Sequence, residues 1–160
     1  MVGYTDSDWA GDPDDQKSTA GYMFTLGLGP LSWASKKQTT LALSSVEAGY
    51  HVAFRASQEA MWLRQILLKF GFQQQHPTPL WCDNQSAIQL AKDPVQHRRR
   101  KHIELHMHFI RNLLQDHVRE VHYFQTDDQV ADIFTKSLTE AKFSKLQSML
   151  GVQEVVIKGG

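Results

Sequence analysis

The chain has 160 residues, the size of one domain. Hydrophobic residues make up 41% of it and charged residues 21%, a composition that excludes intrinsic disorder. Because 17 lysines and arginines balance 17 aspartates and glutamates, the formal net charge is zero, and any nucleic-acid or membrane partner has to recognise a local patch.

The cysteine content and the length of the apolar runs indicate the cellular compartment in which the protein is expected. A single cysteine, Cys82, excludes an internal disulfide and a cysteine-based zinc cluster, and suits a reducing environment. No apolar run approaches the roughly 18 residues that span a bilayer, and the start of the chain lacks the layout of a signal peptide. We therefore expect an intracellular module of a longer polypeptide, without a membrane partner.

Three segments near the start have the composition of β-strands. Residues 2–6 are rich in Val, Tyr and Thr and run into a loop rich in Asp, Gly and Pro. Residues 19–27 and 31–44 are the second and third segments. Since short loops join the three, we expect an antiparallel meander.

A long helix follows the meander. From Ser44, apolar residues recur every three or four positions up to the stop signal Gly71. After a polar linker we expect a short apolar strand over residues 80–84 and a brief helix over residues 85–93, which Pro94 ends.

The last third of the chain predicts one more strand between helices. Residues 102–117 carry an apolar helical stripe, and residues 119–125 read as a strand. Two further helices are expected over residues 127–136 and 139–150, the latter with Thr139 as its N-cap.

This order of elements predicts an α/β fold. Two later strands add in parallel to the antiparallel meander, which makes a five-stranded mixed sheet of three antiparallel strands plus two parallel ones. Helices have to cover both faces of such a sheet. We assign residues 1–151 to one domain and residues 152–160 to a C-terminal tail.

Four acidic residues lie near the ends of predicted elements. Asp6 is near the end of the first strand, and Glu47 is in the first turn of the long helix. Asp83 ends the fourth strand, and Asp132 lies in the penultimate helix. Alone, each has an ordinary explanation: a turn residue, a capping box with Ser44, an N-cap and a solvated helix face.

Together the four acids predict a metal site. Ligand sites in open α/β sheets gather at strand ends, and the first and fourth strands are expected to be neighbours. Carboxylates crowded at such a place raise one another's pKa unless a divalent cation neutralises them. Oxygen ligands without cysteine favour Mg²⁺ or Mn²⁺ over zinc.

Six blocks follow one another from about Tyr4 to Leu150: "YTDSDWAGD", "KSTAGYMFTLG", "SWASKKQTTLALSSVEAGY", "WCDNQSAIQLAKDP", "RRRKHIELHMHFIR" and "DDQVADIFTK". Together they resemble the ribonuclease H domain of copia-type LTR retrotransposon polyproteins, which accompanies a reverse transcriptase. The resemblance implies an RNase H-like fold and endonucleolytic hydrolysis of the RNA strand of RNA–DNA hybrids. The 2′-hydroxyls of the RNA strand then mark the substrate.

The resemblance also implies a two-metal mechanism with Mg²⁺ or Mn²⁺. The family holds two ions with a D-E-D-D set, and the matching positions are Asp6, Glu47, Asp83 and Asp132. By this resemblance Asp6 bridges both ions and Asp132 completes the ion that activates water. Glu47 and Asp83 bind the ion at the leaving 3′-oxygen. One departure is Gly49, which stands where the family usually has a second acid.

The partners follow from the same resemblance. They are an RNA–DNA hybrid and a reverse transcriptase domain that precedes this one in a polyprotein. We expect the isolated domain to be a monomer. In the cell we expect it in cytoplasmic virus-like particles or in the nucleus.

Local basic and polar residues are candidates for contacts with a hybrid. A basic block without an acid can neutralise several phosphates, whereas paired lysines can also merely protect a strand edge. An amide side chain beside Asp83 can contact a sugar or a base, or cap the next helix. The candidates are Arg98, Arg99, Arg100, Lys101, Lys36, Lys37, Asn84 and Gln85.

Two alternatives stay open. The domain can be a catalytically silent module that binds hybrids or braces a reverse transcriptase, and metal-dependent cleavage separates this alternative from the nuclease. It can also be a related polynucleotidyl transferase such as an integrase, which uses clustered carboxylates on the same kind of sheet. Strand transfer into duplex DNA favours that reading.

Overall fold

The computed structural model describes most of the chain and all five expected strands. The described residues are 1–11, 14, 16–39, 42, 44–92, 109–110, 112, 119–123 and 126–152. The strands are β1 (Val2–Asp8), β2 (Thr19–Leu26), β3 (Gly29–Lys37), β4 (Thr78–Cys82) and β5 (Arg119–Tyr123).

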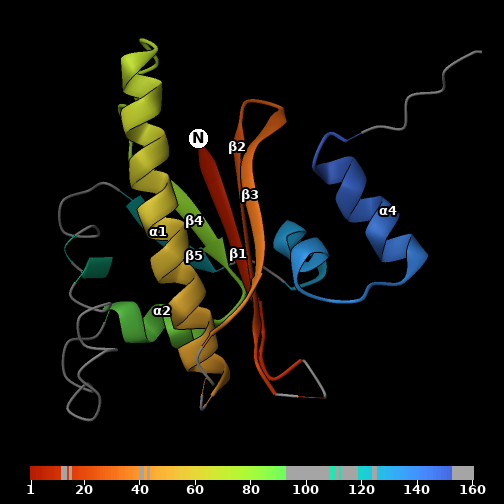
Figure 1. Cartoon of the computed structure of the whole chain (residues 1–160). Coiled ribbons are helices and arrows are strands. Elements are labelled where there is room, and N and C mark those ends of the chain that lie inside the picture. The colour runs from red at the N-terminus through yellow and green to blue at the C-terminus, as the bar shows by residue number, and fades with distance from the viewer. Residues whose placement is uncertain are drawn as a thin grey trace, which may run out of the picture.

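The strands form one mixed sheet in the order β3-β2-β1-β4-β5 (Figure 1). The pairs β1–β2 and β2–β3 are antiparallel, as short hairpin connections allow. The pairs β1–β4 and β4–β5 are parallel, because a long connection leads into β4 and another into β5. The predicted fold class, with three antiparallel strands and two added in parallel, is confirmed.

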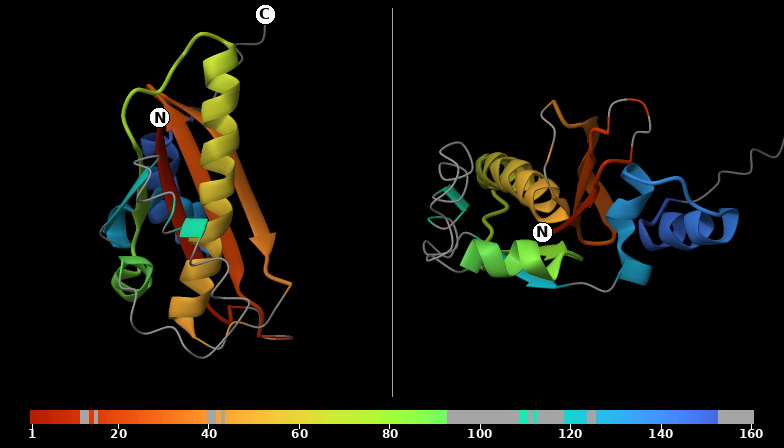
Figure 2. Two further views of the ribbon diagram at one scale, coloured as in Figure 1. Left: turned by 90° about the vertical axis from the view of Figure 1, so that its left-hand side faces the viewer. Right: turned by 90° about the horizontal axis from the view of Figure 1, so that it is seen from below.

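Helices lie on both faces of the sheet, as predicted (Figures 1 and 2). One face carries α1 and α2. The 3₁₀-helix η2 and the last helix α4 lie on the other face. The bounds are α1 (Ser45–Lys69), α2 (Gln85–Lys92), η1 (Thr126–Asp128), η2 (Val130–Phe134) and α4 (Glu140–Met149). No helix in the described ranges is both long and apolar enough to cross a membrane.

Side chains are buried on both faces of the sheet, because successive residues of a strand point to opposite faces. Met23 and Phe24 are neighbours in β2 and both are fully buried, although they point to opposite faces. Phe24 packs in a cluster with Leu63 of α1 and Leu80 of β4. Met23 packs with Leu146 of α4 on the other side. The sheet is therefore the central layer of three, and it positions its strand ends rigidly.

The third strand is shorter than predicted. It ends at Lys37 instead of residue 44, because its partner β2 begins at Thr19, opposite Lys37. Beyond that point the backbone N–H of Gln38 still bonds to the carbonyl of Ser18, and the Gln38 side chain turns to donate to the carbonyl of Ala48. A strand without a ladder partner leaves the sheet.

The predicted helix over residues 127–136 is two short 3₁₀-helices, η1 and η2. Gln129 separates them, with an extended backbone at φ −70° and ψ 100°. Its fully buried side chain accepts a hydrogen bond from the N–H of Ala131 and donates one to the carbonyl of Thr5 in β1. The tertiary contact with β1 therefore overrides a continuous helix.

Parts of two other predictions lie outside the described residues. Of the predicted helix over residues 102–117, only residues 109, 110 and 112 are described, and these are helical. Most of the predicted tail lies outside as well, from residue 153 to residue 160. The helix over residues 139–150 is confirmed as α4, and Thr139 is its N-cap.

Gly21 allows η2 to lie directly on β2. A Cβ atom there would come within 2.6 Å of Thr135 Cγ2, 2.9 Å of Phe134 Cβ and 3.3 Å of the carbonyl of Ala131. Because Phe134 and Ala131 belong to η2, a side chain at this position has to push the 3₁₀-helix away from the sheet.

We therefore expect Gly21→Ala to lower the free energy of unfolding by about 1–3 kcal/mol, the usual cost of overpacking. Urea unfolding followed by circular dichroism measures it. The matched control is Gly29→Ala in the next strand, where a Cβ meets nothing within 4 Å. Equal stability of the two variants would show that η2 does not rest on Gly21.

Candidate functional site

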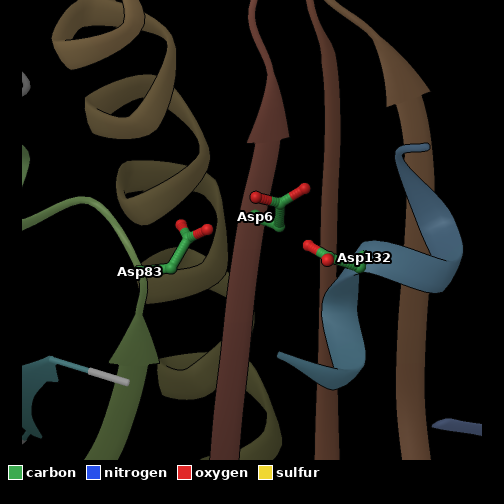
Figure 3. A group of neighbouring side chains, drawn as sticks. All are labelled: Asp6, Asp83 and Asp132. Atoms are coloured by element: carbon green, nitrogen blue, oxygen red, sulfur yellow. The ribbon is translucent and has the colours of Figure 1, made fainter. Parts of the chain in front are cut away.

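Three carboxylates meet at one edge of the sheet. Ligand oxygens of Asp6, Asp83 and Asp132 all lie within 4.8 Å of one another. They come from the end of β1, the turn after β4 and η2, and Figure 3 shows them side by side. Since β1 and β4 are parallel neighbours, their carboxyl ends meet at this edge, as the sequence predicts.

Asp6 is held by the segment that follows η2. It is 2% exposed, and Thr135 Oγ1 donates a hydrogen bond to its Oδ2. Lys136 Nζ lies 3.2 Å from its Oδ1. Each carboxylate oxygen therefore has its own donor, and the side chain has a fixed orientation.

Asp132 is fully buried and ion-paired on both oxygens. Lys136 Nζ lies 2.8 Å from Oδ1, and Lys142 Nζ of α4 lies 2.8 Å from Oδ2. The contact of Gln129 with Thr5 ties η2 to the residue before Asp6. The backbone thus fixes Asp6 and Asp132 relative to each other, independently of the lysines.

Asp83 sits in a turn that its neighbour Asn84 stabilises. Asn84 Oδ1 accepts from the N–H of Ala87 at 2.9 Å and so caps α2. Its Nδ2 donates to the carbonyl of Ser45 at 3.1 Å, which joins this turn to the start of α1. Of the two roles left open for Asn84, the structure therefore shows the cap.

An open polar depression of about 450 Å³ adjoins the cluster. Asp6, Asp83 and Lys136 line it together with Asn84 and Gln85. Gln85 is exposed there, in the first turn of α2. The depression leaves space for a ligand next to the carboxylates.

Glu47 is close to the turn of Asp83 in the fold but is not part of the cluster. Among the described residues, the group whose oxygens lie within 4.8 Å of one another does not include it. It is buried in the first turn of α1, where its N–H bonds to Ser44 Oγ at 3.2 Å. Its Oε1 lies 3.9 Å from Nε2 of His51, one turn further on.

Gly49 has a packing role. A Cβ at this position would lie 3.3 Å from Nδ2 and 3.5 Å from Cβ of Asn84, and 3.4 Å from Cβ of Ala87. The contact with Asn84 Nδ2 is tight, so a side chain at this position would require Asn84 to shift by a few tenths of an ångström. The glycine therefore allows α1 to approach the start of α2 closely.

Two of the predicted basic contacts lie together on the α1 side of the sheet. Lys36 and Lys37, at the end of β3, line a small recess of about 40 Å³ together with His51 and Arg55 of α1. Lys36 and Arg55 are exposed. The recess lies one helical turn from Glu47, through His51. The other four predicted basic contacts, Arg98, Arg99, Arg100 and Lys101, lie outside the described residues.

Burial, more than the neighbouring charges, raises the pKa of two carboxyl groups in the cluster, Asp6 and Asp83. Burial, and next the charge of Asp6, raises the pKa of Asp83 to about 6. Burial also raises the pKa of Asp6, although Lys136 opposes this. Burial alone would lower the pKa of Lys136, but Asp6 and Asp132 raise it above its ordinary value. Binding of a cation between these crowded, buried carboxylates is therefore favourable.

The donor set fits a hard divalent cation. All three groups offer carboxylate oxygens, and Cys82, the single cysteine, points into the core and is buried. A positive charge already lies between two of the carboxylates, the ammonium of Lys136. The residues present are therefore of the kind that holds Mg²⁺ or Mn²⁺.

Three residues of this site were not anticipated from the sequence. They are Lys136, Lys142 and Gln129, which bind or position Asp132. The i,i+4 spacing of Asp132 and Lys136 is a sequence signal for an ion pair. Lys142 and Gln129 carry no such signal, because their partners come from other elements.

Comparison with known proteins gives matches over nearly the whole chain. This chain is 44% identical over 152 residues, 95% of its length, to the retrovirus-related Pol polyprotein from transposon RE2 of Arabidopsis thaliana. It is 40% identical over 152 residues to the corresponding polyprotein from transposon TNT 1-94 of Nicotiana tabacum. The chain spans about a tenth of the length of these polyproteins, 10% and 11%. No protein-family model matches it.

Solved structures show the fold. The crystal structure of LC11-RNase H1 in complex with an RNA/DNA hybrid matches with a TM-score of 0.56 at 14% identity. The match covers 84% of this chain and 92% of the other. The fold of this chain is therefore that of RNase H domains, and the predicted resemblance is confirmed.

In the metal-free protein we expect Asp83 to titrate near pH 6, because burial and Asp6 raise its pKa to about 6. An unfolded chain loses this proton near pH 4, so between about pH 4 and 6 the folded state binds more protons than the unfolded chain. The contribution of Asp83 to stability therefore falls as the pH rises through this range.

Carboxyl ¹³C NMR measures the midpoint, and urea unfolding with a chelator measures stability. Asp83→Asn is the control, and it should lose less stability than the wild type between pH 4.5 and 7. A midpoint near 4 would mean that neither burial nor the charge of Asp6 raises the pKa of Asp83.

Proposed function

The chain is homologous to one segment of the Pol polyproteins of copia-type retrotransposons and has the RNase H fold, and we propose that it hydrolyses the RNA strand of RNA–DNA hybrids with divalent metal ions. The observation that carries this proposal is the meeting of Asp6, Asp83 and Asp132 within 4.8 Å at the carboxyl end of the sheet. Three separate elements supply these carboxylates, so sequence proximity does not explain their meeting.

The carboxylates would hold the metal. Asp6 and Asp132 would be donors for one Mg²⁺ or Mn²⁺, and Asp83 and Glu47 would be donors for a second. When bound, such ions would lower the pKa of water so that hydroxide is available to attack, and would stabilise charge on the phosphate and on the leaving oxygen. Glu47 has to reorient toward Asp83 to join them, from its present position near His51.

The protein's own residues position the reaction. Asp6 is fixed by Thr135 and lies between Asp83 and the 3₁₀-helix that carries Asp132. The polar depression beside these groups opens to solvent and has room for a phosphodiester. Gln85 at its rim can donate to a sugar or a phosphate. The geometry therefore suits a substrate whose backbone lies across the strand ends.

A hybrid has a second strand, and the recess formed by Lys36 and Arg55 is the proposed contact for it. Both side chains are exposed and come from adjacent elements, β3 and α1. Phosphate contacts of this kind provide affinity without sequence preference. Since the net charge is zero, only such local groups attract the substrate. We therefore propose weak, salt-sensitive binding by the isolated domain.

The domain is proposed to act as one part of a longer Pol polyprotein. In a Pol polyprotein it would work next to a reverse transcriptase, on hybrids which that enzyme makes. It would do so within cytoplasmic virus-like particles or the nucleus, and as a monomer when isolated. The rival is a silent module that binds hybrids without cutting them.

With Mg²⁺ or Mn²⁺ we expect the domain to cut only the RNA strand of an end-labelled hybrid at low salt. Asp83→Asn should reduce the rate by about 1,000-fold or more, since it removes a metal donor. The control is Asp128→Asn, whose carboxylate pairs with Lys145 outside the cluster, and its rate should stay close to that of the wild type. A folded wild type that binds the hybrid but never cuts it would favour the silent module.

Lys36→Gln should weaken hybrid binding and make it less dependent on salt. We expect the slope of log affinity against log salt to decrease by about one unit, because one phosphate contact is lost. Fluorescence anisotropy at several salt concentrations measures the slope. Lys69→Gln, at the opposite end of α1, is the control and should leave the slope unchanged.

A further inference from the structure

We propose that Lys136 is an exchangeable internal counter-cation: its ammonium joins Asp6 to Asp132 in the metal-free domain, and a divalent ion has to displace it. This inference rests on the proposed function for the identity of the ion. Lys136, a contact of the carboxylates of Asp6 and Asp132, then takes part in metal exchange.

The geometry places one ammonium between two carboxylates. Lys136 Nζ lies 2.8 Å from Oδ1 of Asp132 and 3.2 Å from Oδ1 of Asp6. Asp132 is fully buried and Asp6 is 2% exposed, so water screens neither charge well. The ammonium bridges oxygens that a shared metal ion would also bridge. Both cations therefore compete for the same donors.

Lys142 differs from Lys136 in this respect. Its Nζ lies 2.8 Å from Oδ2 of Asp132, whereas Lys136 contacts Oδ1 of the same carboxylate. It reaches the site from α4, outside the space between the two aspartates. Lys142 can therefore remain on Asp132 while an ion takes the other oxygen. Lys136 cannot remain in place.

The charge balance explains why a lysine is needed there. Asp6, Asp83 and Asp132 bring three carboxylates together, and Lys136 and Lys142 bring two ammonium groups. Without them the metal-free cluster would hold like charges in a poorly hydrated place, at a cost to folding. With a divalent ion bound, the ammonium of Lys136 becomes surplus positive charge beside it.

The ammonium of Lys136 can move from the carboxylates into solvent. Its side chain is 30% exposed and lines the open polar depression beside Asp83. Four methylenes let the ammonium swing toward solvent while the backbone stays in place. The backbone is fixed independently, because the N–H of Lys136 bonds to the carbonyl of Asp132 at 3.0 Å. Exchange therefore requires one side-chain rotation and no change of the fold.

The test compares Lys136→Met with the wild type and with Lys145→Met. Methionine keeps an unbranched apolar stem of similar length and removes the charge. Lys145 lies in α4 and pairs with Asp128, away from the cluster, so it controls for the loss of a lysine ion pair. Thermal unfolding in a chelator reports the metal-free state, and calorimetric titration with Mn²⁺ reports affinity.

We expect Lys136→Met to unfold at a lower temperature than both other proteins in chelator. We also expect it to bind Mn²⁺ more tightly, on the order of tenfold, because no ammonium has to leave. Lys145→Met should bind Mn²⁺ as the wild type does. Equal or weaker Mn²⁺ affinity of Lys136→Met would overturn the exchange.

A measurement on the wild type avoids the risk that Lys136→Met does not fold. With ¹³Cε-labelled lysines, the Lys136 signal should move to the position of an exposed lysine as Mg²⁺ is added, while that of Lys145 stays. If Mg²⁺ binds and the Lys136 signal does not move, the proposed exchange is overturned but the proposed nuclease is not. Absence of Mg²⁺ and Mn²⁺ binding in every protein would overturn the proposed nuclease as well.

Discussion

The structure depends on one electrostatic constraint: three carboxylates share a space at the end of two parallel strands. Two like charges 4.8 Å apart repel by on the order of 3 kcal/mol at an effective dielectric constant of about 20. Burial of Asp6 and Asp132 adds a desolvation cost to this repulsion. Cations stabilise such a cluster, and the chain supplies two of its own in Lys136 and Lys142.

The elements around the cluster are arranged to hold it rigidly. Gln129 interrupts the 3₁₀ segment so that its side chain can reach β1 beside Asp6. Gly21 removes the side chain that would keep η2 off the sheet, and Ser35 Oγ of β3 donates to the carbonyl of Phe134 at 2.6 Å. Asn84 connects the turn of Asp83 to α1. Local propensity gives way at these points to tertiary contacts, as is common around functional sites.

The carboxylate cluster and a basic recess lie at different places in the fold, although the whole chain is neutral. The carboxylates lie at the ends of β1 and β4, while Lys36 and Arg55 form a recess between β3 and α1. His51 and Glu47 lie between the two regions on the first turns of α1. The duplex substrate proposed for this chain would place one strand at the carboxylates and the other at the recess, although the total charge of zero does not indicate such a partner.

The sequence by itself determined the five strands, their mixed sheet and the strand ends that carry Asp6 and Asp83. These features follow from local hydrophobic period and turn residues, which a single sequence displays. Only the tertiary structure decided that η1 and η2 replace one helix and that β3 stops at Lys37. It also decided that two lysines neutralise the cluster and that Glu47 stays outside it. Apart from the i,i+4 pair of Asp132 and Lys136, these outcomes depend on contacts between residues of different elements, and the local sequence pattern does not display such contacts.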